Sequence, residues 1–208
     1  MLCLYINTAT KENHIALIRD NELLIENKWL SNRDETQKLL VSIEELLKTH
    51  KKSFDDLTHL FIINGPGGFT SLRVGITIAN TISYLTKCKI SSNTLFELRA
   101  FEIDPKIKDY IIVHSATKRE IFIEGKGKYT NNYNDINTQN FNEFLNFLSN
   151  NKKTPIIGEL IPEHKEQIKT TSTVLQEPDQ KAFLELISKA KWKENMIIEP
   201  FYGRMGQV

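Results

Sequence analysis

The sequence predicts an α/β fold: a mixed sheet with an antiparallel edge, followed by a second, smaller α/β unit. Two observations predict it. Three apolar, strand-like runs open the chain, and only the polar turn at 20–22 separates the second from the third. Helical and strand-like segments then alternate as far as residue 101, and helical crossovers favour parallel pairing of the strands they connect. With 208 residues, the chain can form one or two units with a sizeable core.

The first half is expected to fold as strand, strand, strand, helix, strand, helix, strand, helix. Leu2, Leu4 and Ile6 alternate with other residues, as expected for a strand. The first helix carries one apolar stripe at helical spacing, made of Leu39, Leu40, Ile43, Leu46 and Leu47. The expected ranges are 2–6, 14–19, 23–29, 34–49, 60–63, a long helix ending near 85, 89–91 and 94–101.

Asp104-Pro105 marks the expected boundary, so we expect domains at 1–103 and 104–208. The second half is interpreted as a reduced, divergent copy of the first, and its topology stays open. Residues 125–140 are polar and rich in glycine and asparagine, which favours a loop. The elements expected in this half are strands at 110–114, 120–124 and 155–157 and helices at 141–148 and 181–190.

The composition is that of an ordinary soluble globular protein, with 40% apolar and 25% charged residues. Lys and Arg total 27 against 26 Asp and Glu, a net charge of +1, whereas a stand-alone nucleic-acid binder usually has a basic excess. Cys3 and Cys88 lie in apolar surroundings and are expected to be reduced core residues. The chain opens with a strand and has no apolar run of membrane-spanning length. We therefore expect no secretory signal, no membrane contact and a cytoplasmic location.

A loop with three glycines and a proline precedes the long helix. Glycine allows positive φ and the close approach of a backbone or ligand, and a helix starting from such a loop presents free N–H groups. Gly65, Gly67 and Gly68 are therefore candidate nucleotide or anion contacts, and Thr70 and Ser71 are candidate helix caps. The alternative is a shaped turn that only orients the helix, because no lysine follows the glycines as it does in a P-loop.

The long helix is apolar on more than one face, which predicts burial on more than one side. Gly75, Ala79 and Ser83 recur every four residues and form a strip of small residues, against which another helix can pack closely. A glycine costs about 1 kcal/mol relative to alanine in a helix interior, which favours a packing role. The packing partner is either a helix of the same chain or a partner protein, and the spacing leaves both open.

Residues 64–75 resemble the GPGSFTG(L/V)RIG signature of the TsaB family, also called YeaZ. Shorter motifs of that family match in the same order along the chain, at 4–10 (L-x-I-D-T-S-T), 33–40 (R-x-H-S-x-x-L-L), 116–122 (D-A-R-R-x-E-V-Y) and 200–204 (P-x-Y-x-R). The resemblance implies the fold of the actin-like ATPase (ASKHA) superfamily, with two RNase H-like mixed-sheet domains, the second reduced. Tyr202 and Arg204 are candidates to dock the tail on the first domain, and a mobile tail is the alternative.

Two positions depart from this pattern where actin-like ATPases hold metal and phosphate. Asn7 stands where the family has an aspartate on the first strand, and Ser115 where the second-half aspartate would be. An amide or hydroxyl is a poorer ligand for a hard cation than a carboxylate. We therefore expect no catalytic residue and no cofactor for this chain alone, with ATP or ADP and metal held by partner subunits. Glu35 stands where many family members have histidine.

The histidines show no spacing typical of a metal site, unlike those of the related TsaD family, which carries a metal-binding histidine pair. They are His14, His50, His59, His114 and His164. We therefore expect no metal site in this chain, and no Ser–His or Cys–His pair can be assigned from the sequence.

The resemblance implies a non-catalytic assembly subunit for threonylcarbamoyladenosine (t6A) formation in tRNA. Such a subunit pairs with a TsaD-type transferase and helps to recruit a TsaE-type ATPase. Family members pair through helices near the glycine loop, which favours a partner interface at Leu72, Gly75, Ile76, Ala79 and Ser83. A free chain is then expected to form a two-fold homodimer, and Ala79→Glu to abolish pairing without unfolding. The alternatives are a stand-alone small actin-like ATPase or phosphotransferase, and a protease, for which no nucleophile–base pattern is present.

Four basic residues flank the strand expected at 120–124, namely Lys118, Arg119, Lys126 and Lys128. They are interpreted either as contacts to tRNA phosphates within the complex or as a solvated face that alternates with Glu120 and Glu124. The solvated face is the favoured interpretation.

Overall fold

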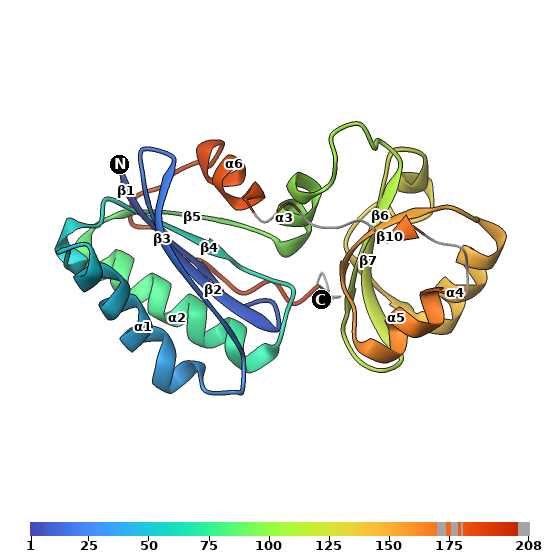
Figure 1. Cartoon of the computed structure of the whole chain (residues 1–208), viewed down its shortest axis with the longest axis horizontal. Coiled ribbons are helices and arrows are strands. Elements are labelled where there is room, and N and C mark those ends of the chain that lie inside the picture. The colour runs from blue at the N-terminus through green and yellow to red at the C-terminus, as the bar shows by residue number, and fades with distance from the viewer. Residues whose placement is uncertain (170–173, 176–178, 180, 204–208) are drawn as a thin grey trace. The chain divides into compact units, whose positions relative to one another are not determined.

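The computed structural model describes residues 1–169, 174–175, 179 and 181–203 and shows two compact units (Figure 1). The first unit comprises Met1–Leu95 and Phe183–Tyr202, and the second comprises Phe96–Ala182 and Gly203. The division therefore follows residue 95, whereas the sequence placed it after residue 103. The physical reason is that Phe96, in the first turn of a helix, and Ile103, just after that helix ends, pack into a core of the second unit.

The first unit is built on a five-stranded sheet with the order β3-β2-β1-β4-β5. Its strands are β1 (Leu2–Asn7), β2 (Glu12–Arg19), β3 (Glu22–Leu30), β4 (His59–Ile63) and β5 (Lys89–Asn93). Neighbours among β3, β2 and β1 pair antiparallel, and those among β1, β4 and β5 pair parallel. The predicted mixed sheet with an antiparallel edge is confirmed.

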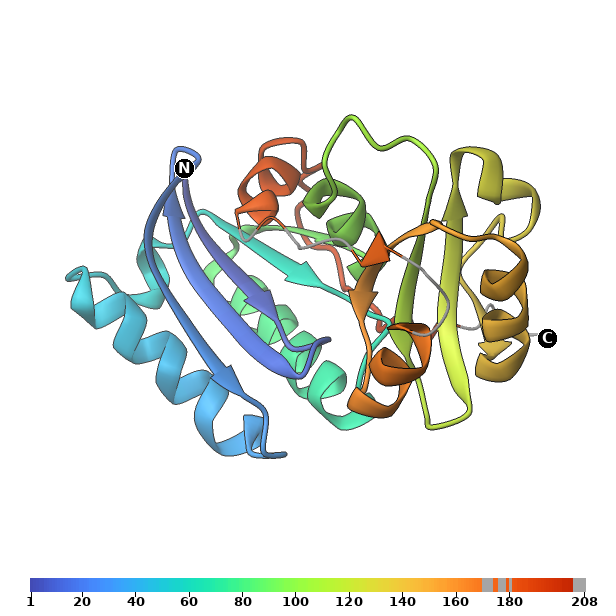
Figure 2. The same cartoon turned by 45° about the vertical axis from the view of Figure 1, so that its right-hand side comes forward.

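Helices cover both faces of this sheet. Figures 1 and 2 show α1 (Glu35–Thr49) and α2 (Phe69–Thr86) side by side on one face, and α6 (Ala182–Ser188) over the other. On the α6 side, the ring of Phe183 lies 4.8 Å from that of Tyr5 on β1. The predicted stripe of α1 is correct for four of its members, which are buried. Leu40 is 49% exposed, so its place in the stripe was wrong.

The second unit repeats the topology of the first. Its sheet has the order β10-β9-β6-β7-β8, so the central strand β6 pairs antiparallel with β7 and parallel with β9, as β1 does with β2 and β4. The strands are β6 (Tyr110–Ser115), β7 (Glu120–Lys126), β8 (Asn137–Asn140), β9 (Pro155–Glu159) and β10 (Val174–Leu175). Its helices are α3 (Leu95–Glu102), α4 (Phe141–Asn150) and α5 (Pro162–Lys169). The segment expected as a loop at 125–140 holds β8 and the 3₁₀ turn η2 (Gly127–Asn131).

Both cysteines are buried free thiols, as predicted. In the described part of the chain, no helix combines the length and apolar character needed to cross a membrane.

Candidate functional site

The glycine loop joins β4 to α2, and its first two glycines are shaped by the chain's own backbone. Gly65 has a φ of 122°, and a Cβ there would lie well inside 3.0 Å of the carbonyl oxygen of Phe201. A Cβ on Gly67 would overlap the main chain of Ala9 in the same way. Of the three, only Gly68 has room for a Cβ, since the nearest neighbour would be Ser71 Oγ, in ordinary contact at 3.8 Å. Packing alone therefore accounts for glycine at 65 and 67, and nucleotide contact by Gly65, Gly67 and Gly68 stays a prediction.

The N-terminus of α2 is not capped as the sequence suggested. Gly68 is the N-cap residue, and no side chain of the described part of the chain caps it, because Thr70 and Ser71 already lie inside the first turn. Ser71 instead hydrogen-bonds the carboxylate of Glu35 at the start of α1. The loop thus fixes α2 against β1 and α1.

Asn7 and Ser115 occupy equivalent places, each at the last position of the central strand of its sheet. Asn7 is buried, and its Oδ1 accepts a hydrogen bond of 3.0 Å from the N–H of Ala9. Ser115 Oγ accepts a 3.0 Å hydrogen bond from the N–H of Ile161. Asn7 therefore holds the turn that follows β1, and Ser115 holds the segment just before α5. Neither side chain supplies a carboxylate.

Ser115 also contacts a histidine that sequence reasoning did not connect with it. Its Oγ lies 2.8 Å from Nδ1 of the buried His164, and His164 Nε2 lies 3.1 Å from the carbonyl oxygen of Lys118. Because a carbonyl only accepts, Nε2 carries the proton and Nδ1 accepts from the serine hydroxyl. The ring of His164 also stacks on Phe141 at 3.6 Å. The pair fastens α5 to β6, and no spacing signal could have shown it, because 49 residues separate the two.

The predicted partner interface lies inside the first unit. Leu72 and Ala79 have no exposed surface, and Gly75, Ile76 and Ser83 are also buried. Gly75 faces the side chain of Thr8 so closely that a Cβ would overlap its Oγ1. The strip of small residues therefore packs on the same chain. The spacing alone had left open whether it packs on the same chain or on a partner protein. The interface assignment for these five residues was wrong, because their shared face turns toward β1 and the core.

The opposite sides of α1 and α2 carry exposed apolar residues. The outer helix face, as we define it, consists of Leu40 and Val41 on α1 and Phe69, Arg73, Thr77 and Tyr84 on α2. The apolar members are 49–73% exposed. Arg73 stacks over the Phe69 ring at 3.8 Å, and its Nε donates to the hydroxyl of Tyr202 at 2.7 Å. This contact ties the C-terminal segment to the first turn of α2, and Arg204 lies outside the described residues.

Comparison with known proteins decides the family. A family profile described as "TsaD: tRNA N6-adenosine threonylcarbamoyltransferase" matches residues 29–183. The chain is 27% identical over 185 residues to "tRNA threonylcarbamoyladenosine biosynthesis protein TsaB" of Buchnera aphidicola, covering 88% of this chain and 77% of that protein. The protein of that name in Escherichia coli is 35% identical over 83 residues, or 40% of this chain and 36% of that protein. The chain belongs to the TsaB (YeaZ) family.

A solved structure extends the TsaB likeness over the whole fold. It is described as an uncharacterized protein with similarity to peptidase YEAZ, from Pseudomonas aeruginosa, and gives a TM-score of 0.71 at 13% identity. The match covers 98% of this chain and 99% of that one. With the repeated strand order of the two sheets, it confirms the predicted fold of two α/β units, each built on a mixed sheet.

Glu35, at the start of α1, is a buried carboxylate. Burial raises its pKa, but hydrogen bonds from Ser31, Asn13 and Ser71 outweigh that effect and leave the pKa below its usual value. The Asn13 Nδ2 bond measures 3.1 Å. Glu35 therefore ties the start of α1 to β2 and α2.

The four basic residues expected to flank the strand at 120–124 lie at the two ends of β7. Lys118 and Arg119 precede the strand, and Lys118 pairs with Glu163 at 3.8 Å. Lys126 ends the strand and pairs with Glu124 at 2.7 Å, and Lys128 follows it. The length of β7 therefore separates the two pairs of basic residues. Among the residues that the structure describes, no group of three or more His, Cys, Asp and Glu could hold a metal ion.

Proposed function

We propose that this chain is a non-catalytic subunit for threonylcarbamoyladenosine formation in tRNA and that it pairs with a TsaD-type transferase. The observation that carries the proposal is the match to TsaB proteins along the two-unit fold, together with the neutral residues Asn7 and Ser115 at the two strand ends where the sequence resemblance implies acids. The side chain of Asn7 is hydrogen-bonded to Ala9, and that of Ser115 to Ile161 and His164, all in the same chain.

These hydrogen bonds make Asn7 and Ser115 poor candidates for binding a catalytic metal ion. A hard cation such as Mg²⁺ is held by carboxylates and phosphate oxygens in octahedral geometry. Asn7 offers an amide oxygen that already accepts from Ala9, and Ser115 offers a hydroxyl that already accepts from Ile161. The chemistry, the nucleotide and the metal are therefore assigned to partner subunits, which include a TsaE-type ATPase. Contact with tRNA is made within the complex.

The outer helix face is the proposed contact with the TsaD-type partner. Phe69 is 56% exposed and Tyr84 is 73% exposed, so apolar side chains stand at both ends of α2. Leu40 and Val41 on α1 add to the same side, since α1 and α2 lie side by side on the sheet (Figure 1). Exposed apolar patches of this kind mark interaction sites. Without its partner, the same face favours a two-fold homodimer.

The test mixes the pure chain with the TsaD-type protein of the same organism and measures mass by size-exclusion chromatography with light scattering. The same mixtures are assayed for threonylcarbamoyl transfer to tRNA, with the TsaE-type ATPase and adenylate synthesis supplied. We expect a heterodimer and transfer that depends on this chain. Thr77→Glu on the outer helix face should prevent pairing, while Asn146→Glu on exposed α4 should not.

Failure to pair, with transfer unchanged by the chain, would refute the assembly role. The stand-alone ATPase then becomes the hypothesis to test. It requires magnesium-dependent ATP turnover by the pure chain that disappears on substitution of Gly68, the loop glycine that has room for a Cβ.

A further inference from the structure

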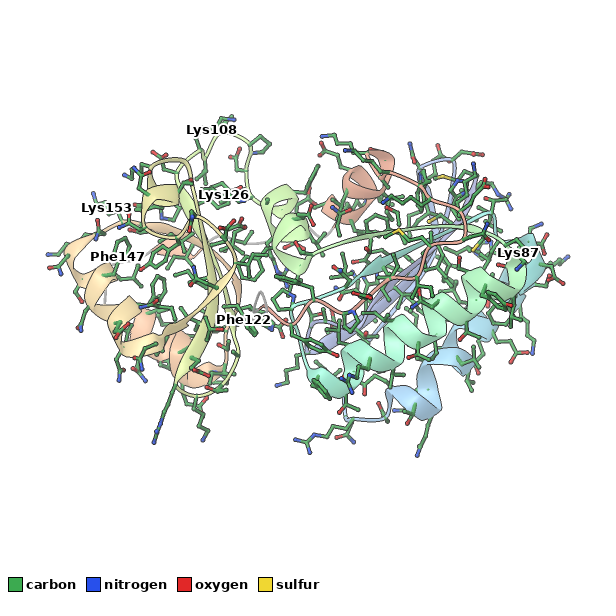
Figure 3. The ribbon with its side chains drawn as sticks, turned by 180° about the vertical axis from the view of Figure 1, so that it is seen from behind. Lys87, Lys108, Phe122, Lys126, Phe147 and Lys153 are labelled. Atoms are coloured by element: carbon green, nitrogen blue, oxygen red, sulfur yellow. The ribbon has the colours of Figure 1, made fainter. Side chains whose placement is uncertain are left out.

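The second unit carries a concentration of lysines at one end of its sheet. Lys106 and Lys108 precede β6, Lys126 ends β7, Lys128 lies in η2, and Lys152 and Lys153 precede β9. We call these six residues the basic end. Figure 3 labels three of them, Lys108, Lys126 and Lys153, at the same end of the unit.

Strand pairing and hydrogen bonds bring these segments together. Lys126 pairs with Tyr110 across β7 and β6, and Lys128 N–H donates to Asp109 Oδ1 at 2.9 Å. The Tyr129 hydroxyl lies 3.1 Å from Thr154 Oγ1, which joins η2 to the residues just after Lys153. Because β7 and β9 flank β6, their ends are about 10 Å apart. The lysines therefore stand on a framework of fixed backbone.

The charge of the unit is polarised toward this end. Over its described residues up to Ala182, 12 Lys and Arg balance 12 Asp and Glu. The segments of the basic end contain six lysines against four acids, Asp104, Asp109, Glu124 and Asp135, an excess of two positive charges. The remainder of the unit is therefore negative by two. A general richness in lysine would spread positive charge evenly over the surface of the unit. The positive charge is instead concentrated at the basic end.

Most of these ammonium groups face solvent without a carboxylate. Within the described residues, Lys126 is paired with Glu124, whereas Lys106, Lys108, Lys128, Lys152 and Lys153 take part in no ion pair. All five are exposed. Asp104 and Asp109 accept hydrogen bonds from the backbone N–H groups of Lys106 and Lys128, which directs these carboxylates toward the main chain.

We propose that the basic end binds the phosphate backbone of tRNA. Several unpaired lysines on a rigid support attract a polyanion through counterion release, without reading its sequence. The near-zero net charge of the whole chain argues against strong binding by the chain alone, so the basic end adds contacts to a complex that holds the tRNA elsewhere. The inference rests on the proposed function for the identity of the RNA.

The test compares two triple variants of the full chain in complex with the TsaD-type protein. One carries Lys128→Gln, Lys152→Gln and Lys153→Gln. The control carries Lys51→Gln, Lys165→Gln and Lys191→Gln at exposed positions elsewhere. Fluorescence anisotropy gives the affinity for unmodified tRNA between 50 and 200 mM salt. The first variant should bind about tenfold more weakly at low salt, with a salt slope lower by about 2, and the control should match the wild type.

A second measurement separates this inference from the proposed function. Lysine acetylation of the full chain, alone and in the complex, is compared with and without tRNA, and Lys108, Lys128, Lys152 and Lys153 should be protected. If the two triple variants bind tRNA with equal affinity and tRNA does not protect the four lysines from acetylation, the basic end does not bind tRNA. This holds even if pairing and transfer depend on the chain. Protection without pairing supports the basic end and refutes the assembly role.

Discussion

Asn80 of α2 binds the main chain of Ile198 with both ends of its side-chain amide. Nδ2 donates to the Ile198 carbonyl oxygen and Oδ1 accepts from the Ile198 N–H, each at 2.9 Å. Asn64 adds two bonds further along: its side-chain Nδ2 donates to the carbonyl oxygen of Glu199 at 3.2 Å, and its main-chain carbonyl oxygen accepts from Phe201 N–H at 2.7 Å. These bonds explain why residues 183–202 belong to the first unit.

Asn80→Leu should release this segment. The substitution leaves one N–H and one carbonyl of Ile198 without their partner, which costs about 1–3 kcal/mol of unfolding free energy. Limited proteolysis should cut the variant near residue 198 before any other site, and urea unfolding should show the loss of stability. Thr77→Ala, at an exposed position one turn earlier on α2, is the control and should behave as the wild type. Unchanged proteolysis of the Asn80 variant would show that the amide does not hold the segment.

Gly75→Ala and Gly68→Ala should differ sharply, although both glycines belong to the same motif. A Cβ at Gly75 would overlap the side chain of Thr8, whereas a Cβ at Gly68 would make only an ordinary contact with Ser71 Oγ. Overpacking of this kind costs about 1–3 kcal/mol, so Gly75→Ala should lower the unfolding free energy by that amount. Gly68→Ala should stay within about 0.5 kcal/mol of the wild type. The measurement is urea unfolding followed by circular dichroism, and equal stabilities would contradict the packing of Gly75 on Thr8.

Ala79→Glu and Thr77→Glu test which face of α2 points outward. Ala79 is fully buried, so a carboxylate there has no charged partner and should destabilise the fold by several kcal/mol. This reverses the expectation from sequence that Ala79→Glu would leave the chain folded. Thr77 is exposed two residues earlier, so Thr77→Glu should keep the wild-type melting temperature. Thermal unfolding of both variants checks the assignment, which fails if Thr77→Glu is the less stable.

His114 should make the second unit less stable in acid. Burial, and then the positive charge of Arg99, lowers the pKa of His114 from 6.5 to about 4. Between these values the unfolded chain binds a proton that the folded chain does not, so the unfolding free energy falls as the pH drops from 6.5 toward 4. The loss is of the order of 3 kcal/mol at full shift. His14 on β2 has a similarly lowered pKa, to about 4, and adds to the effect.

The variant that isolates this effect is His114→Gln, which cannot titrate. Its unfolding free energy, measured in urea at pH 7 and at pH 4.5, should fall less than that of the wild type over the same interval. The His14 contribution remains in both proteins and cancels in the comparison. Parallel losses in the two proteins would mean that His114 does not titrate with the lowered pKa.

The first unit could be predicted from the sequence because its strands are apolar and its turns carry strong signals. The long helix and the strands around the glycine loop follow from such patterns. The second unit could not be completed in this way. Its edge strand β8 has the sequence Asn-Thr-Gln-Asn, which shows no apolar alternation, and β10 has only two residues. Pairing with β7 and β9 makes them strands, and pairing is not visible in local sequence.

In the candidate site too, local sequence signals could be predicted, whereas contacts between distant segments could not. Small residues at 75, 79 and 83 indicate close packing, but they do not identify the packing partner. A segment of the same chain and a partner protein both require small side chains at these positions. The structure decides by burial. The glycines at 65 and 67 were recognised as special, yet the backbones of Phe201 and Ala9 that require them lie far away in the sequence.

Ser115→Ala should loosen α5, because this hydroxyl joins three segments of the second unit. It accepts from Ile161 N–H and donates to Nδ1 of His164, which in turn donates to the Lys118 carbonyl. Alanine leaves the Ile161 donor and the buried His164 acceptor without partners, at a cost of about 1–3 kcal/mol. Hydrogen exchange in Pro162–Lys169 should accelerate, while Ser149→Ala on exposed α4 should leave it unchanged. If Ser115→Ala leaves exchange in α5 at the wild-type rate, the hydroxyl does not position the helix.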